Sequence, residues 1–152
     1  MSNFDFLKQN KIFNNFSESC IEAENGIGLN TVTCSILCRR ALELGVKWLY
    51  ANDNDLKIPY QNNLSALVHD ITFKNIIDEK LLKQIEYIIK LGNYAVHNNK
   101  KISREEAILS LRYLYNFMQW IAYCYSDNFE EKEFDESILQ TQSVNVLAVK
   151  ES

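Results

Sequence analysis

The sequence predicts an all-α protein: a helical bundle of about four main helices with short additional helices and a C-terminal extension. The composition is suited to helices, since 152 residues contain only one proline and four glycines. Apolar residues also recur every three or four positions over several long stretches, which is the period of a buried helix face. With 47% hydrophobic residues the chain can build one core, and we expect a single bundle over residues 1–127.

The first half of the chain is predicted to form three helical elements. The first covers residues 4–24, with a break in its pattern near Asn10. A second, longer helix begins near Thr31, and Asn30 is a suitable N-cap for it. A short helix is expected over residues 64–71, after a loop.

Two further helices are predicted in the second half. The helix over residues 81–99 has the clearest apolar face, and Asp78 can cap its start. The last helix runs to about Tyr125 and opens with Ser103 and Glu106, the spacing of a capping box. Residues 128–152 are expected to be an acidic linker or tail that leads toward a further, downstream domain.

Polar stripes run beside the apolar faces of the second helix and of helix 81–99. We expect these residues to form one polar cluster: Arg39, Arg40, Glu43, Lys47, Lys90, Asn93 and His97. Gly45 and Gly92 lie in the neighbouring apolar stripes, which predicts a tight crossing of the two helices there. By helical-wheel geometry, the polar stripes of the two helices lie on the same side of the helix contact if the helices are parallel. They lie on opposite sides of that contact if the helices are antiparallel. The connecting segment is long enough for either arrangement.

This cluster supports two interpretations. His97 and Asn93 are candidate catalytic residues that could act on a phosphate together with Arg39 or Arg40. Alternatively, the same side chains satisfy one another in a buried network, and we favour this interpretation because such networks need no catalysis. Three basic residues near His97 are candidate nucleic-acid contacts: Lys100, Lys101 and Arg104.

Cysteine spacing does not indicate a metal site. Cys20, Cys34, Cys38 and Cys124 are expected to be small buried hydrophobes in a reducing cytoplasm, because no second ligand pair completes a tetrahedral set. We therefore expect neither a metal nor a cofactor in this chain. The net charge of −4 disfavours tight nucleic-acid binding by the whole surface. No signal peptide and no membrane-spanning segment are expected.

Two motifs resemble a known bacterial family. The stretch CRRALELGVKWLY, followed by IIKLGNYAVH, is similar to helical domains of unassigned function that are related to the HEPN domains. These domains often form the N-terminus of the R subunits of type I restriction–modification enzymes. The opening SNFDFLKQNKIFNNFSESCIEAE resembles the start of such subunits, and the similarity covers residues 3–125. Relatives usually carry arginine just before Gly92, where this chain has Ile89 and Lys90.

The resemblance implies a non-catalytic accessory or docking domain. Its parent would be a type I site-specific deoxyribonuclease that uses ATP and Mg²⁺ and contacts DNA within a complex. The protein partners would then be modification and specificity subunits, or a downstream motor domain. One alternative is a stand-alone HEPN-like ribonuclease or nucleotide-binding domain centred on His97. Another is a homodimeric interaction module that uses the aromatic last helix. Its aromatic residues, which include Tyr113, Tyr115 and Trp120, are more than one buried stripe can hold, and aromatic residues are enriched at interfaces.

Overall fold

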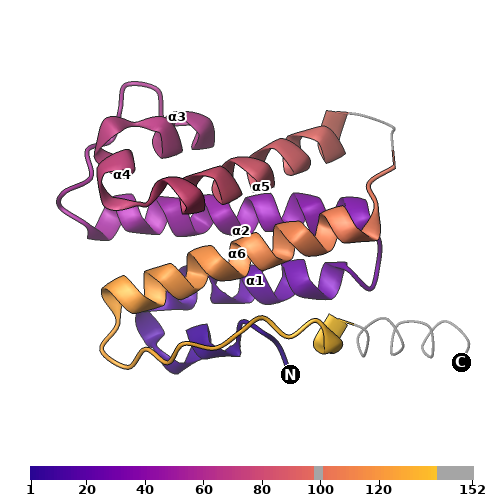
Figure 1. Ribbon diagram of the computed structural model, residues 1–152. Coiled ribbons are helices and arrows are strands. Elements are labelled where there is room, and N and C mark those ends of the chain that lie inside the picture. The colour runs from indigo at the N-terminus through magenta and orange to yellow at the C-terminus, as the bar shows by residue number, and fades with distance from the viewer. Residues whose placement is uncertain (98–100, 140–152) are drawn as a thin grey trace, which may run out of the picture.

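Helix α2 (Thr31–Asn52) is the element on which the other long helices pack (Figure 1). The computed structural model describes residues 1–97 and 101–139. Within them, α1 (Asn14–Gly26), α5 (Glu79–His97) and α6 (Arg104–Tyr125) each lie against α2. No strand occurs in the described residues, so the predicted all-α class is confirmed. The organising helix is α2, however, and not α5, whose stronger amphipathic pattern dominates the sequence.

The helix starts follow the predicted capping residues. Asn30 accepts a hydrogen bond from the backbone amide three residues later at 2.7 Å, and Asp78 does the same for α5 at 2.7 Å. At the start of α6 the Ser103 hydroxyl accepts from the Glu106 amide at 3.1 Å, while the Glu106 carboxylate accepts from the Ser103 amide at 3.0 Å. These bonds satisfy N–H groups that have no partner inside the helix.

The N-terminal segment is interrupted where the pattern predicted a break. Two 3₁₀ turns, η1 (Asp5–Gln9) and η2 (Lys11–Phe13), precede α1. The side chain of Asn10 separates them and accepts a hydrogen bond from the amide of Ile12 at 3.2 Å.

The predicted short helix is two helices. α3 (Leu64–His69) is followed by α4 (Ile71–Ile76), and Asp70 lies between them with an extended backbone. The carboxylate of Asp70 accepts from the amide of Thr72 at 3.0 Å and so caps α4. Tyr50 of α2 donates to the carbonyl of Leu67 at 2.6 Å, which attaches this pair to the end of α2.

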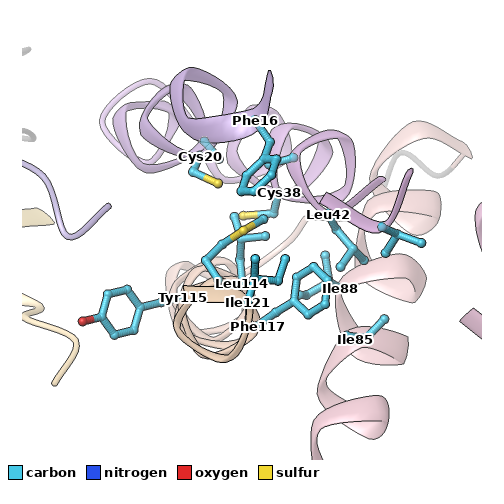
Figure 2. Packing of buried hydrophobic residues seen from close by; sticks show 14 of the residues in the cluster. Phe16, Cys20, Cys38, Leu42, Ile85, Ile88, Leu114, Tyr115, Phe117 and Ile121 are labelled. Atoms are coloured by element: carbon cyan, nitrogen blue, oxygen red, sulfur yellow. The ribbon is translucent and has the colours of Figure 1, made fainter. Parts of the chain in front are cut away.

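The core lies where α1, α2, α5 and α6 meet, and Figure 2 shows side chains from all four helices directed into it. α2 presents small residues there, including Cys34, Cys38 and Ala41, each fully buried. Cys20 of α1 is buried as well, but Cys124 is exposed, so the expectation of a buried thiol is wrong at that position. None of the helices in the described part of the chain has the length and apolar character to cross a membrane.

Residues 127–139 return along the bundle instead of leaving it. The side chain of Asn3 donates to the Asp135 carbonyl at 3.1 Å and accepts from the Asp135 amide at 2.7 Å. Tyr115 points away from the other labelled core residues in Figure 2 and donates to the Lys132 carbonyl at 2.6 Å. Leu139 is fully buried. The packed unit therefore extends past the predicted boundary at 127, while the expected downstream domain lies outside the described residues.

We predict that Leu139→Ala destabilises the bundle by at least about 2 kcal/mol, because a fully buried leucine is replaced by a cavity. Leu29, which is 62% exposed, provides the matched control, and Leu29→Ala should change stability by less than about 0.5 kcal/mol. Urea unfolding followed by circular dichroism measures both. Equal midpoints for the two variants would mean that residues 127–139 do not pack as described.

A second prediction concerns Tyr125, whose hydroxyl donates to the Asp53 carboxylate and ties the end of α6 to the end of α2. Burial, followed by the hydrogen bond and charge of Asp53, raises the pKa of Tyr125. The folded state therefore favours the neutral phenol, and this contribution to stability is complete below about pH 10 and is lost as pH rises further. Tyr125→Phe should cost about 1 kcal/mol near neutral pH, and its stability should converge with wild type above about pH 10.

Unfolding curves measured between neutral and alkaline pH provide the check. Tyr60→Phe is the control because Tyr60 is fully exposed, and it should follow wild type at every pH. A constant gap between Tyr125→Phe and wild type across this range would contradict the prediction.

Candidate functional site

Helices α2 and α5 pack in antiparallel directions (Figure 1). The start of α2 lies beside the segment that follows α5, since Thr31 donates to the carbonyl of Ile102 at 2.7 Å. The other end of α2 is joined through Tyr50 to α3, which precedes α5. The antiparallel direction places the polar flanks of the two helices on opposite sides of their contact, so the two predicted stripes do not merge.

Gly92 accommodates a side chain rather than a backbone. A Cβ atom at position 92 would lie 2.6 Å from Cβ and 2.7 Å from Cδ of Arg39, so the methylene groups of Arg39 occupy that space. Gly45 faces α6 instead, where a Cβ atom would meet Met118 at 3.0 Å and Phe117 at 3.1 Å. The predicted Gly45–Gly92 crossing is therefore wrong, because each glycine serves a different helix contact.

The members of the predicted polar cluster are mostly exposed, and the bond that the structure shows among them lies within α2. Glu43 is half-buried and accepts from Lys47 of its own helix at 3.2 Å. No hydrogen bond or ion pair between described residues joins the α2 members to the α5 members. The remaining exposed members are Arg40, Lys90, Asn93 and His97. Arg40, Asn93 and His97 are exposed, so they do not form the expected buried network with Glu43, and the convergence of these four side chains stays a prediction.

Glu86, also on the polar side of α5, pairs with the other histidine. Its carboxylate lies 3.5 Å from Nε2 of His69, and Nδ1 of His69 lies 2.8 Å from the carbonyl of Ser65. The two ring nitrogens of His69 therefore face acceptors on two helices, so His69 connects α3 to α5 at the surface. Sequence spacing did not indicate this pair, because the two residues lie on different helices with no shared motif.

Arg39 is the member of the predicted cluster with an unusual environment. Its Nε atom is buried and has no hydrogen-bond partner among the described residues. The residue as a whole is half-buried. A buried N–H without a partner is costly and uncommon in folded proteins. Arg39 therefore differs from its neighbour Arg40, which is exposed.

The basic patch is only partly visible. Lys101 and Arg104 are exposed at the start of α6, and Lys100 lies outside the described residues. Their contact with nucleic acid stays a prediction.

The buried thiols have no chemical function that the structure supports. A hydrogen bond with Cys38, and then burial, raise the pKa of Cys34 well above its usual range, and burial does the same for Cys20. A protonated thiol is neither a good nucleophile nor a metal ligand. Among the described residues no group of three histidine, cysteine or acidic side chains could hold a metal ion.

Most aromatic residues of α6 contact other rings of the molecule, although Tyr123 is 68% exposed. Tyr115 is 2% exposed and packs edge-on against Phe4, while Tyr113 meets Tyr87 of α5 at a centroid distance of 5.3 Å. Trp120 packs against Phe117. Part of the aromatic surplus on α6 therefore packs against α5 and the N-terminal segment, and the expected partner surface on α6 stays a prediction.

A cavity of about 620 Å³ lies between the N-terminal segment and residues 126–132. Its lining includes the side chains of Asn3, Phe6 and Phe129. The sequence did not predict this cavity because its walls come from opposite ends of the chain.

The fold and the exposed face of α5 define an all-α helical-bundle protein with a polar helix surface. The chain belongs to the family described as a domain of unknown function (DUF4145), whose model matches residues 22–142. That match includes α2, α5 and α6, and it continues through the returning segment. No curated protein and no solved structure matches the chain.

We predict that Gly92→Ala lowers stability by about 1 kcal/mol or more. The new methyl group must displace Arg39, which costs more than the roughly 1 kcal/mol that alanine gains in helix propensity. His97→Ala on the same helix is the control and should stay within about 0.5 kcal/mol of wild type, because His97 is exposed. Thermal unfolding measures both variants. A larger loss for His97→Ala than for Gly92→Ala would favour a buried histidine network instead.

Proposed function

We propose that this chain is a non-catalytic docking domain that positions a larger protein assembly. The observation that carries the proposal is the exposed face of the second half of α5, which consists of Lys90, Asn93, Val96 and His97. Val96 is 54% exposed beside the three polar side chains. A polar, solvent-accessible helix face with one exposed apolar residue is typical of the rim of a protein interface.

The assembly we propose is a type I restriction–modification enzyme. This part of the proposal rests on the resemblance of CRRALELGVKWLY and IIKLGNYAVH to the N-terminal domains of R subunits. The partners would be modification and specificity subunits or a downstream motor, and ATP, Mg²⁺ and DNA would be bound by the parent complex. The net charge of −4 favours indirect contact with DNA. The proposal also places the chain in the cytoplasm, where free thiols such as Cys124 persist.

The docking role is tested by titrating the chain into purified modification and specificity subunits in a calorimeter, which measures the affinity of binding. We expect saturable binding that weakens about tenfold in the double variant Lys90→Glu/His97→Ala, as for loss of central interface residues. Lys83→Glu is the matched control, because Lys83 is an exposed lysine nearer the start of α5. Absence of binding, or equal weakening by the control, contradicts docking through this face.

A second experiment tests the non-catalytic part. The purified chain is incubated with single-stranded RNA and with duplex DNA plus Mg²⁺, and we expect no cleavage above the background of a His97→Ala sample. Cleavage by wild type that disappears in His97→Ala would instead establish a nuclease centred on this histidine.

A further inference from the structure

The returning segment (residues 127–139) is bonded to the rest of the molecule through its backbone. The N–H group of Asp135 donates to the Asn3 side chain at 2.7 Å, and the Asp135 carbonyl accepts from that side chain at 3.1 Å. The carbonyl of Lys132 accepts from the Tyr115 hydroxyl at 2.6 Å. Hydrogen bonds to the main chain supply affinity in peptide recognition and do not depend on the side chains of the peptide. The surface formed by Asn3 and Tyr115 can therefore hold other peptides in the same way.

Two side chains of the returning segment contact α6 through specific groups. The ring of Phe134 packs edge-on against Tyr115 at a centroid distance of 5.5 Å, and the guanidinium group of Arg112 lies 5.2 Å from the centre of the Phe134 ring. Arg112 also forms an ion pair with the carboxylate of Glu136. One arginine of α6 thus contacts an aromatic ring and, two residues later in the segment, an acidic group. These contacts select side chains, whereas the backbone bonds do not.

The returning segment is attached by few buried groups. Leu139 is buried and Phe134 is half-buried, but most of the segment is exposed, and so are its hydrogen bonds with Asn3. The four long helices contact one another without it. Segments with few buried apolar contacts and exposed backbone bonds open at a lower free energy than the core of a protein. The segment can therefore leave α6 while the bundle stays folded, which uncovers Tyr115 and Arg112.

The returning segment does not fill the face that it covers. The cavity of about 620 Å³ has residues of this segment in one wall and residues of the N-terminal segment in another. Phe6, which lines the cavity, also packs edge-on against Tyr115 at a centroid distance of 5.6 Å, so the cavity adjoins the contacts of Phe134. Its volume lies within the range of ligand sites. A peptide of another sequence has room there for an additional side chain.

We propose that this face binds a peptide of a partner protein in place of the returning segment. The peptide carries an aromatic residue and, two positions later, an acidic residue. The ring packs between Tyr115 and Arg112, and the carboxylate pairs with Arg112. The returning segment is then a built-in competitor, which lowers the apparent affinity for the partner by the fraction of molecules whose face is uncovered. This interaction goes beyond docking through α5, because neither Lys90 nor His97 takes part in it.

The test is a titration of the full chain into a fluorescently labelled peptide with the sequence of residues 129–139, followed by anisotropy. We expect saturable binding to the Phe134→Ala chain, with an affinity about tenfold or more above that of wild type, because the weakened segment competes less. The Glu133→Ala chain is the control, since Glu133 is exposed, and its affinity should stay within about twofold of wild type. No saturable binding to Phe134→Ala, or equal affinities of Phe134→Ala and wild type, would overturn the inference.

A double-mutant cycle in the Phe134→Ala chain tests the role of Arg112. Either Glu136→Ala in the peptide or Arg112→Met in the chain should weaken binding about threefold or more. With Arg112→Met present, the peptide change should have no further effect, because its partner is already absent. Glu131→Ala in the peptide is the control and should alter the affinity by less than about twofold. Independent losses from the two changes would overturn the assignment of Arg112.

A second copy of the chain is the other possible occupant. Sedimentation should show a wild-type monomer, whereas a dimer that the labelled peptide dissociates would assign the face to a second copy and overturn a different partner. Circular dichroism melting verifies that the variants are folded. If Phe134→Ala is unfolded, the Glu136→Ala chain loosens the segment at an exposed residue, and an affinity equal to wild type would then overturn the inference. The subunit-binding assay with Lys90→Glu/His97→Ala is independent, so either proposal can fail alone.

Discussion

The burial of α2 on several sides is the constraint on which the rest of the structure depends. A helix that is covered by three others must keep small side chains where its neighbours approach closely. Gly45 meets this requirement toward α6, where Met118 and Phe117 fill the available space. What remains of the α2 surface carries Arg40 and Lys47, both exposed. The packing requirements of α2 therefore determine which of its polar residues can meet another molecule.

Local features of this fold could be predicted because local interactions produce them. Asn30, Asp78 and Ser103 cap helices through bonds to residues three positions later, so sequence spacing alone identifies them. The direction of α5 relative to α2 has no such local cause. It depends on how residues 53–78 pack, and their length is compatible with either direction. The predicted burial of Asn93 and His97 against α2 failed at this step, because both side chains are exposed.

Two other differences have the same origin in long-range packing. A helical glycine predicts a close neighbour, but it does not specify whether backbone or a side chain such as Arg39 fills the space. The acidic composition after Asp127 is typical of a linker, although Phe129, Phe134 and Leu139 recur every five residues within it. These three apolar residues pack on the bundle and form a periodic signal that charge composition obscured. The prediction of the fold class was thus accurate, whereas the predictions that depended on long-range packing were not.

The paired hydrogen bonds between Asn3 and Asp135 have a mechanical consequence. They join two segments near opposite ends of the described chain, on one side of the bundle (Figure 1). A protein fused before Asn3 and another fused after Leu139 would emerge close together. Tension between two such neighbours would first load this pair of bonds and the buried Leu139, and only later the core around α2. The bundle could then tolerate force between its attachments while the contacts of α2 and α5 stay intact.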